Sequence, residues 1–261
     1  MILELKDIKL GFSNARGEVS NLLAGVDMSV RKGTVTALIG GNGAGKTTLF
    51  NIISGFERGY RGRIFFEGRE ISEMLPHRIS RLGIGRLFQG RQLMEDLTLM
   101  ENMKVASVDT PCELPFDSIF RGKRILESEA AKEQQAVDLL KRVFGEDNKY
   151  LRMLDTKASD LSFGEQRLIA LVRLLMGDNR LLLLDEPTSG INPRYTESFR
   201  SVIREMIEKE GLTVLMIEHN MSFVRSVADE CHYLASGRII KKGSVSEVLD
   251  DHIIRKDYMG L

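Results

Sequence analysis

The sequence predicts an α/β protein with a parallel sheet that carries a phosphate-binding loop, an N-terminal antiparallel β-subdomain and an inserted α-helical subdomain. Three observations support this fold class. An apolar run at 35–39 leads directly into a glycine-rich loop, as in strand–loop–helix phosphate sites. Short strands alternate with glycine turns before about residue 75, and helical periodicity begins near residue 90. After residue 180, the order strand, helix, strand is typical of parallel α/β sheets.

The first 75 residues contain strand-like segments separated by glycines. The segments are ILELKDIKLGF, VDMSVRKG, VTALI and GRIFFEG. Their composition and alternation favour an antiparallel sheet beside the strand that precedes the glycine-rich loop.

A helical subdomain is expected at about 90–176. Within ESEAAKEQQAVDLLKRVFG, helical spacing predicts a buried stripe of Ala136, Leu139, Leu140 and Val143. The segment 107–124 interrupts the helical pattern with two prolines but keeps two phenylalanines, which favours a long ordered loop or short helices. These four residues are Pro111, Pro115, Phe116 and Phe120.

The segment LIGGNGAGKTTLF, residues 38–50, contains the pattern G-x-x-x-x-G-K-[ST]. Its glycines permit positive φ and close backbone approach, so that successive N–H groups form a nest for a polyphosphate. Lys46 adds a charge for the β- and γ-phosphates, Thr47 offers a hydroxyl to Mg²⁺, and the helix that starts here directs its positive end at the anion. The predicted nucleotide-binding residues of the loop are Gly40, Gly41, Asn42, Gly43, Ala44, Gly45, Lys46, Thr47 and Thr48.

Two carboxylates, Asp185 and Glu186, end the apolar strand in RLLLLDEPTSG, at the position where parallel sheets bind ligands. Asp185 is suited to hold Mg²⁺. Glu186 is placed to accept a proton from, or to orient, a water that attacks the γ-phosphate.

The segment LSFGEQ, residues 161–166, precedes an apolar helical pattern. Ser162 and Glu165 have the spacing of a capping box, which predicts a helix start after Ser162. A helix start of this kind is also an anion site, so that one geometry could cap the helix and meet a phosphate.

A helix is also expected in NPRYTESFRSVIREMIEKEG. Asn192 is the expected N-cap, Pro193 the first helical residue, and Gly211 follows the end of the helix. The predicted buried stripe is Phe199, Val202, Ile203, Met206 and Ile207.

Composition restricts the classes of function. The 261 residues include 37 Lys plus Arg and 37 Asp plus Glu, so no net charge favours nucleic acid or an anionic membrane. Two cysteines, Cys112 and Cys231, are too few for a disulfide framework and favour a reducing cytosol. No apolar run approaches membrane-spanning length and no signal segment is present, so any role at a membrane is expected to be peripheral.

The order and spacing of these motifs resemble those of ATP-binding-cassette ATPases over nearly the whole chain. GGNGAGKT corresponds to Walker A, LSFGE to the signature, LLLLDE to Walker B, RLFQG to the Q-loop and IEHN to the switch-histidine segment. The resemblance implies that Phe12 stacks on adenine, that Gln89 reaches Mg²⁺ or the water and touches the transport partner, and that His219 contacts the γ-phosphate. It assigns nucleotide contacts to Ser162, Gly164 and Glu165, and it groups Glu186, His219 and Gln89 as catalytic.

The sequence departs from the family pattern at three positions. Phe163 stands where the signature usually has glycine, and Glu165 stands where it usually has glutamine. Asn192 stands where the D-loop usually has aspartate, so the negative charge of that loop is missing.

Within the family, RLGIGRLFQ, SGINP, IEHNM and the terminal DYMGL are most similar to ATPase subunits of branched-chain, or hydrophobic, amino-acid importers. Urea importers and the lipopolysaccharide exporter ATPase share parts of this pattern and remain alternatives.

The family resemblance also implies partners. Nucleotide is sandwiched between the Walker motifs of one ATPase domain and the signature of another, so a second ATPase subunit, identical or related, is expected. Two membrane permeases and, indirectly, a solute-binding protein complete the expected assembly, on the cytoplasmic face of the cell membrane and without nucleic acid. The permease contact is expected near Gln89 and the following GRQLMEDLTLMENM. The apolar residues of that segment suit a contact or a core equally: Leu93, Met94, Leu97, Leu99 and Met100.

Two other classes of protein are less consistent with the sequence. Cassette ATPases that act on DNA or ribosomes usually carry a long coiled coil between the Walker motifs or two cassettes, and the chain has neither. A metabolite kinase with the same phosphate loop would leave LSFGEQ without a function.

Overall fold

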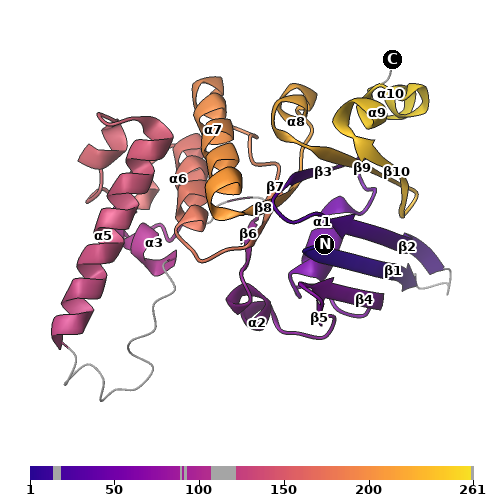
Figure 1. The fold of residues 1–261 in the computed structure, drawn as a ribbon, viewed down its shortest axis with the longest axis horizontal. Coiled ribbons are helices and arrows are strands. Elements are labelled where there is room, and N and C mark those ends of the chain that lie inside the picture. Colours follow the sequence, from indigo (N-terminus) through magenta and orange to yellow (C-terminus); the bar gives the residue numbers. More distant parts are fainter. Residues whose placement is uncertain (14–18, 89, 91–92, 107–121, 260–261) are drawn as a thin grey trace. The chain divides into compact units, whose positions relative to one another are not determined.

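The computed structural model describes residues 1–13, 19–88, 90, 93–106 and 122–259, and its elements are labelled in Figure 1. Gln89, Cys112 and the two prolines and two phenylalanines of the segment 107–124 lie outside the described residues. The chain forms two compact units. Unit 1 comprises Met1–Arg86, Arg180–Thr188 and Arg204–Leu261, and unit 2 comprises Leu87–Asn179 and Ser189–Ile203.

An antiparallel sheet of four strands confirms the predicted N-terminal β-subdomain. Its order is β2-β1-β4-β5, with β1 at Leu3–Ser13, β2 at Val19–Val30, β4 at Arg61–Phe66 and β5 at Arg69–Glu70. A bulge at Asp7, which has φ 52, interrupts the register in β1. The bulge shifts the buried positions from Leu3 and Leu5 to Ile8 and Leu10, so all four contribute to the core.

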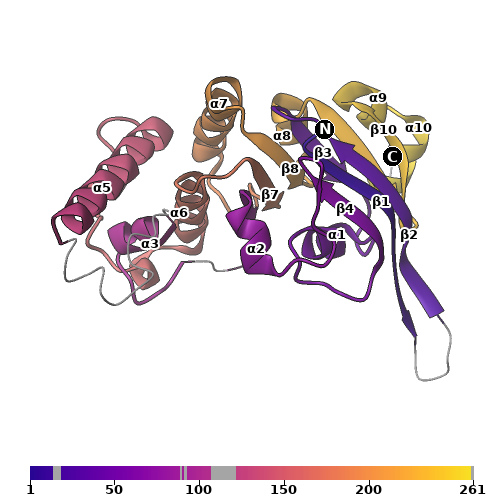
Figure 2. The ribbon, with the colours of Figure 1, turned by 60° about the horizontal axis from the view of Figure 1, so that its bottom comes forward.

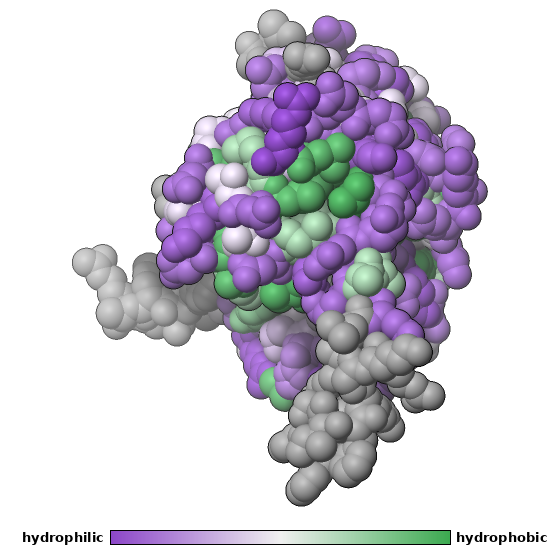
Figure 3. Space-filling view, turned by 90° about the vertical axis from the view of Figure 1, so that its left-hand side faces the viewer, coloured by the Kyte–Doolittle hydropathy of each residue, from purple (hydrophilic) through white to green (hydrophobic). Residues whose placement is uncertain are grey.

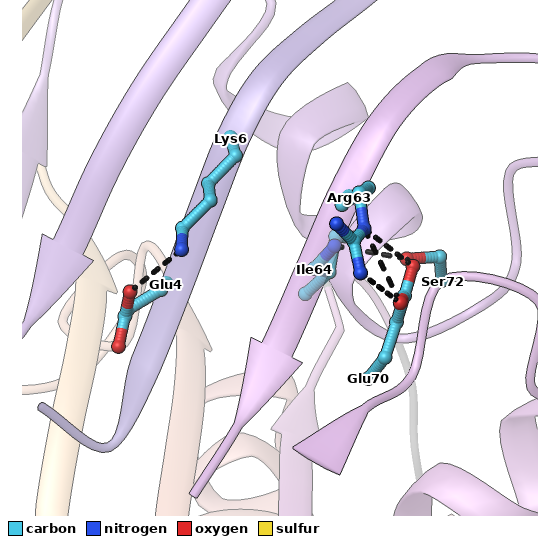
Figure 4. A network of polar contacts seen from close by, with 6 residues as sticks. All are labelled: Glu4, Lys6, Arg63, Ile64, Glu70 and Ser72. Carbon is cyan, nitrogen blue, oxygen red and sulfur yellow. Dashed lines mark hydrogen bonds and ion pairs between the residues drawn. The ribbon is translucent and has the colours of Figure 1, made fainter. Parts of the chain in front are cut away.

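Charged side chains cover part of this sheet (Figure 4). Arg63 donates three hydrogen bonds to the Glu70 carboxylate, from Nη2 to Oε2 at 2.7 Å and from Nε to each of the two oxygens at 3.2 Å. Ser72 donates to Glu70 at 3.0 Å and accepts from the Ile64 N–H at 2.9 Å, which ties β5 to β4. The charged groups are exposed to solvent, so such pairs contribute little to stability and chiefly shield the edge of the sheet.

A second sheet has the order β10-β9-β3-β8-β7-β6. Its central strands β3 (Val35–Ile39), β8 (Thr213–Ile217) and β7 (Leu181–Asp185) are completely buried and pair in parallel. β6 spans Ile84–Leu87 at one edge. Because β3, β8 and β7 are parallel, their carboxyl ends lie on the same side of the sheet, and β8 lies between the other two strands.

Three of the remaining helices of unit 1 connect strands and the last two follow β10 (Figure 2). They are α1 (Lys46–Ile53), α2 (Pro76–Arg81), α8 (Met221–Val227), α9 (Val245–Leu249) and α10 (His252–Met259). One hydrophobic core joins both sheets and α1, and includes Leu3, Leu38, Phe50, Leu183 and Ile217.

The hairpin of β9 (Glu230–Ala235) and β10 (Arg238–Ser244) was not foreseen in the sequence. It turns at Ser236 and Gly237, whose φ angles are 49° and 70°. Positive φ at both turn residues is the mark of a tight hairpin turn. The available signal was therefore the Ser-Gly pair between two short strand-like segments.

Unit 2 is mainly helical. It contains α3 (Leu99–Ala106), α5 (Gly122–Phe144), the short helices η1 (Lys149–Arg152) and η2 (Ala158–Asp160), and α6 (Phe163–Leu175). The predicted stripe of α5 is buried, from Ala136 to Val143. The helix α7 spans Pro193–Glu210, as expected, and its five predicted stripe residues are buried.

The apolar residues after the Q-loop divide between core and surface. Leu93 and Leu99 are buried, Leu97 and Met100 are partly buried, and Met94 is 49% exposed. The buried Asn102 holds this segment, because its amide donates to the carbonyls of Met94, Leu97 and Thr98.

No helix among the described residues has the length and hydropathy needed to cross a bilayer. Hydrophilic residues predominate on the face shown in Figure 3, and a group of hydrophobic residues gathers in its upper middle.

Candidate nucleotide site

The phosphate loop lies between β3 and α1, as the sequence predicts. Gly45, with φ 97, is the N-cap of α1 and provides no side-chain cap, so the first N–H groups of the helix remain open to an anion. The loop also packs closely on its neighbours. A Cβ atom at Gly40 would lie 2.2 Å from the Leu234 carbonyl oxygen, a separation that only glycine avoids.

Lys46 folds back over this loop. Its ammonium group donates to the carbonyls of Gly40 at 2.7 Å and Gly41 at 2.9 Å. Burial lowers the pKa of Lys46, while the nearby carboxylates of Glu186 and Asp185 partly oppose that change. The ammonium group therefore sits among acceptors at the loop, where phosphate oxygens could replace the two carbonyls.

The strand order brings Glu186 and His219 together. Glu186 follows β7 and donates its backbone N–H to the Ile217 carbonyl at the end of β8. His219 follows β8, and its Nε2 lies 3.4 Å from Glu186 Oε1. Glu186 has φ 50, a left-handed conformation that is uncommon for a residue with a side chain.

A cavity of about 240 Å³ joins these groups. It is lined by Leu22, Asn42, Gly43, Ala44, Gly45, Lys46, Thr47, Thr48, Glu186, Ile217 and His219. Most of the predicted phosphate-loop residues thus share one cavity with the predicted general base and with the switch histidine.

A second cavity of about 500 Å³ adjoins the first through Leu22 and the loop residues Asn42, Gly43 and Ala44. Its other lining residues are Asn21, Gly41, Tyr233, Ala235, Ser236 and Gly237. The β9–β10 turn therefore contributes a wall that the sequence reasoning missed. Together the two cavities offer room for the phosphates and for the rest of a nucleotide.

Phe12 is described only through its backbone. In the β1–β2 register it pairs with Ser20, beside Asn21 and Leu22, which line the larger cavity. Its stacking on adenine stays a prediction.

The predicted metal ligands fit a Mg²⁺–nucleotide complex. Thr47 lines the smaller cavity, and Asp185 is the buried last residue of β7 but does not line that cavity. Among the described residues, no group of three or more His, Cys, Asp or Glu side chains is placed to hold a metal. Mg²⁺ bound with a nucleotide usually takes one or two protein oxygens plus phosphate and water oxygens, which a hydroxyl and a carboxylate satisfy. Gln89, the third predicted ligand, lies outside the described residues.

Glu218 is a site residue that the sequence reasoning did not identify. Its buried carboxylate accepts hydrogen bonds from the N–H groups of His219 at 3.0 Å and Asn220 at 3.2 Å. It also accepts from Thr188 in the loop after β7. A charged residue directly after the apolar strand TVLMI was the available signal.

The signature segment lies at the start of α6 in unit 2. The hydrogen bonds between Ser162 and Glu165 there confirm the predicted capping box. The Glu165 N–H lies 3.4 Å from Ser162 Oγ, and Glu165 Oε2 accepts from the Ser162 N–H at 2.9 Å. A Cβ atom on Gly164 would lie 2.6 Å from the Gly190 carbonyl oxygen, so the signature and the D-loop touch through backbone. Phe163, one of the departures from the family pattern, is half exposed and lies beside Gly190.

Comparison with known proteins agrees with this site. The family model described as "ABC transporter" matches residues 23–189. The "Probable branched-chain amino acid transport ATP-binding protein LivG" of Archaeoglobus fulgidus is 34% identical over 239 residues, which cover 90% of this chain and 88% of that protein. The "High-affinity branched-chain amino acid transport ATP-binding protein BraF" of Pseudomonas aeruginosa is 31% identical, over 99% of this chain and 98% of its own.

Solved structures match along the whole chain. A nucleotide-free ATP-binding cassette from an ABC transporter superposes with a TM-score of 0.79 at 31% identity, covering 100% of this chain and 99% of that one. The ADP conformation of such a cassette gives 0.79 at 32% identity, with the same coverage.

Proposed function

Because the chain belongs to the ABC transporter family, we propose that it is the ATP-hydrolysing subunit of a transporter that takes up branched-chain or other hydrophobic amino acids. The names of the relatives support the solute class. The observation that carries the hydrolytic role is the cavity in which the phosphate loop, Glu186 and His219 meet.

In this proposal the residues of unit 1 divide the chemistry of hydrolysis. Lys46 and the N–H groups at the start of α1 bind the β- and γ-phosphates. Thr47, Asp185 and Gln89 would hold Mg²⁺, which would supply positive charge to neutralise the phosphates.

Glu186, which lines the same cavity, accepts a proton from the attacking water or orients it. His219 lines the same cavity with its Nε2 3.4 Å from Glu186 Oε1, and in this proposal it would contact the γ-phosphate and orient the carboxylate. Glu218 connects the loop after Glu186 to the loop that carries His219, because its carboxylate accepts hydrogen bonds from Thr188 and from the backbone N–H of His219.

The proposal includes partners. The chain carries one phosphate loop and one signature, so a nucleotide would be closed between two ATPase subunits, identical or related, with Ser162, Gly164 and Glu165 of one facing the phosphates held by the other. The whole chain would act as one nucleotide-binding domain, with its helical subdomain at about 90–176.

The ATPase pair would dock peripherally on two permeases at the cytoplasmic face of the membrane, with a solute-binding protein acting indirectly and without nucleic acid. Of the apolar residues after Gln89, Met94 is the best candidate for the permease contact because it is exposed, whereas Leu93 and Leu99 serve the core.

Glu186→Gln tests the hydrolytic role. Removing only the charge should lower hydrolysis by about 10² to 10⁴, the range of a lost general base, while ATP still binds. The variant should accumulate as an ATP-bound dimer, or as a closed mixed pair if its partner is a related ATPase. Gel filtration with Mg-ATP and a phosphate-release assay measure both effects. The control is Glu146→Gln, whose carboxylate is exposed and far along the chain from the site.

Hydrolysis by Glu186→Gln at the parental rate would refute the role of Glu186. The solute is tested separately, by purifying the chain with its permeases from membranes and measuring uptake of labelled leucine and urea into liposomes. Uptake of urea alone would contradict the amino-acid assignment.

A further inference from the structure

Glu165 places a negative charge at the start of the signature helix. Its carboxylate accepts from the Ser162 hydroxyl at 2.6 Å and from the Ser162 N–H at 2.9 Å. The positive end of α6 is the place where a phosphate would be stabilised, and the chain's own carboxylate already uses the hydroxyl that would meet it.

Glu165 is ionised at neutral pH. Its partial burial raises its pKa, but hydrogen bonds from Lys149 and Ser162 outweigh burial and lower the pKa below its usual value. An ionised carboxylate beside an incoming phosphate is repulsive unless a cation offsets it.

Lys149 is the cation that meets this carboxylate. Its ammonium group forms an ion pair with Glu165 Oε1, the oxygen that does not accept from Ser162. The two oxygens of one carboxylate therefore divide between a lysine and the signature serine.

The backbone of Lys149 is held in place at the start of η1, while its side chain is half exposed. The neighbouring Asn148 is buried and caps η1, because its side chain accepts from the N–H groups of Tyr150 and Leu151 at 3.0 and 3.3 Å. Its amide donates to the Gly145 carbonyl at 2.7 Å. The Lys149 ammonium also lies 5.2 Å from the centre of the buried Tyr150 ring, close enough for a cation–π contribution.

We propose that Lys149 is a positioning residue for ATP-driven pairing: it neutralises and holds Glu165, so that the Ser162 hydroxyl can leave Glu165 and donate to the phosphate bound by the second ATPase subunit. This inference rests on the proposed function, in which the signature of one subunit meets the nucleotide of the other.

The test uses the full chain in the Glu186→Gln background and measures, by light scattering, the Mg-ATP concentration at which half of the protein is paired. Lys149→Met should raise that concentration by about threefold to tenfold, the range expected for one uncompensated charge contact. Lys149→Arg should stay near the parent. Lys141→Met, which removes a lysine paired with the exposed Glu146, is the matched control and should have no effect.

Glu165→Gln supplies the rescue. Glutamine also serves in a capping box, so this change removes the charge but keeps the helix start. The double variant Lys149→Met with Glu165→Gln should return to the parental ATP requirement or below it. Thermal unfolding without nucleotide is measured on every variant.

A lysine with a structural role alone would lower the unfolding temperature and leave the ATP requirement unchanged, which overturns the inference. Failure of Glu165→Gln to rescue Lys149→Met overturns it as well. If the Glu186→Gln parent does not pair at any ATP concentration, either with itself or with a related ATPase subunit that purifies with it, the proposed function fails and the inference fails with it. If the parent pairs and Lys149→Met does not differ from it, only the inference fails.

Discussion

Thr188 and Glu218 are joined by two hydrogen bonds to one carboxylate oxygen, from the Thr188 N–H at 2.8 Å and from its hydroxyl at 2.7 Å. The other oxygen accepts from the backbone of His219 and Asn220. Glu218 is only 2% exposed. One buried carboxylate therefore fixes the loop after Glu186 to the loop that carries His219.

Thr188→Val should loosen this connection, because valine keeps the shape of threonine but cannot donate to Glu218. Loss of a hydrogen bond to a buried charged group is expected to lower the free energy of unfolding by about 1.5–3 kcal/mol. Hydrolysis should also fall, with ATP affinity maintained. Urea unfolding and phosphate release measure the two effects. The control is Thr34→Val, which removes a hydroxyl that donates to the Arg31 carbonyl at 2.9 Å. Unchanged hydrolysis in Thr188→Val would show that the hydrogen bond from the Thr188 hydroxyl to Glu218 does not affect the chemistry of the site.

Gly164→Ala should displace the signature from the D-loop. The added Cβ would lie 2.6 Å from the Gly190 carbonyl oxygen, so one of the two backbones must move. Nucleotide binding by the isolated chain should persist, because the loop residues that bind it belong to unit 1. Pairing in the Glu186→Gln background should weaken. Calorimetry measures nucleotide binding and light scattering measures pairing. Loss of nucleotide binding by the isolated Gly164→Ala chain would show that the signature supports the nucleotide site of its own chain.

His232 should make stability depend on pH. Burial is the main cause that lowers its pKa from the usual 6.5 to about 4. The nearby Glu230 carboxylate raises the pKa by a smaller amount, and the Lys242 ammonium lowers it further. Below pH 6.5 the unfolded chain takes up a proton that the folded chain accepts only near pH 4, so stability is full above 6.5 and declines toward 4. The loss should reach about 3 kcal/mol, at 1.36 kcal/mol per unit of pKa. Urea unfolding between pH 4.5 and 7.5 measures it, and a slope that is unchanged in His232→Gln would assign the effect to other groups.

Phe12→Ala should raise the ATP concentration needed for hydrolysis without abolishing hydrolysis. Stacking on adenine contributes binding that the ground and transition states share, so KM rises while kcat is nearly constant. Phe56→Ala, which removes an exposed phenylalanine of unit 1, is the matched control. An unchanged KM in Phe12→Ala would indicate that Phe12 has no contact with the nucleotide.

Local patterns in the sequence were sufficient to predict the elements that depend on residues close together in the chain. The phosphate loop, the capping box at Ser162 and the buried stripe of α7 each depend on residues a few positions apart, and all were predicted. The strand order was not contained in such patterns. The 3.4 Å separation of His219 Nε2 and Glu186 Oε1 exists because β8 and β7, the strands that precede these residues, pair directly in parallel.

Pairs distant in sequence were missed for the same reason. Lys149 meets Glu165 across the connection from η1 to α6, and Thr188 meets Glu218 across a helix and a strand. In each case the two residues are unremarkable by themselves, because charge and exposure at one position do not specify a partner. The bulge at Asp7 shows the limit even within one strand, since it changes which alternate residues of β1 are buried.

The positive φ of Glu186 has a consequence for which residues are expected at this position in related proteins. A residue with a side chain costs roughly 1–3 kcal/mol in that backbone region, whereas glycine adopts it freely. A residue with a side chain is thus the less stable choice at this position, and the proposed role of Glu186 in hydrolysis is a reason for it to be retained. In a descendant that kept the fold but no longer needed hydrolysis, drift should replace this glutamate early, and glycine or asparagine should be the favoured successors.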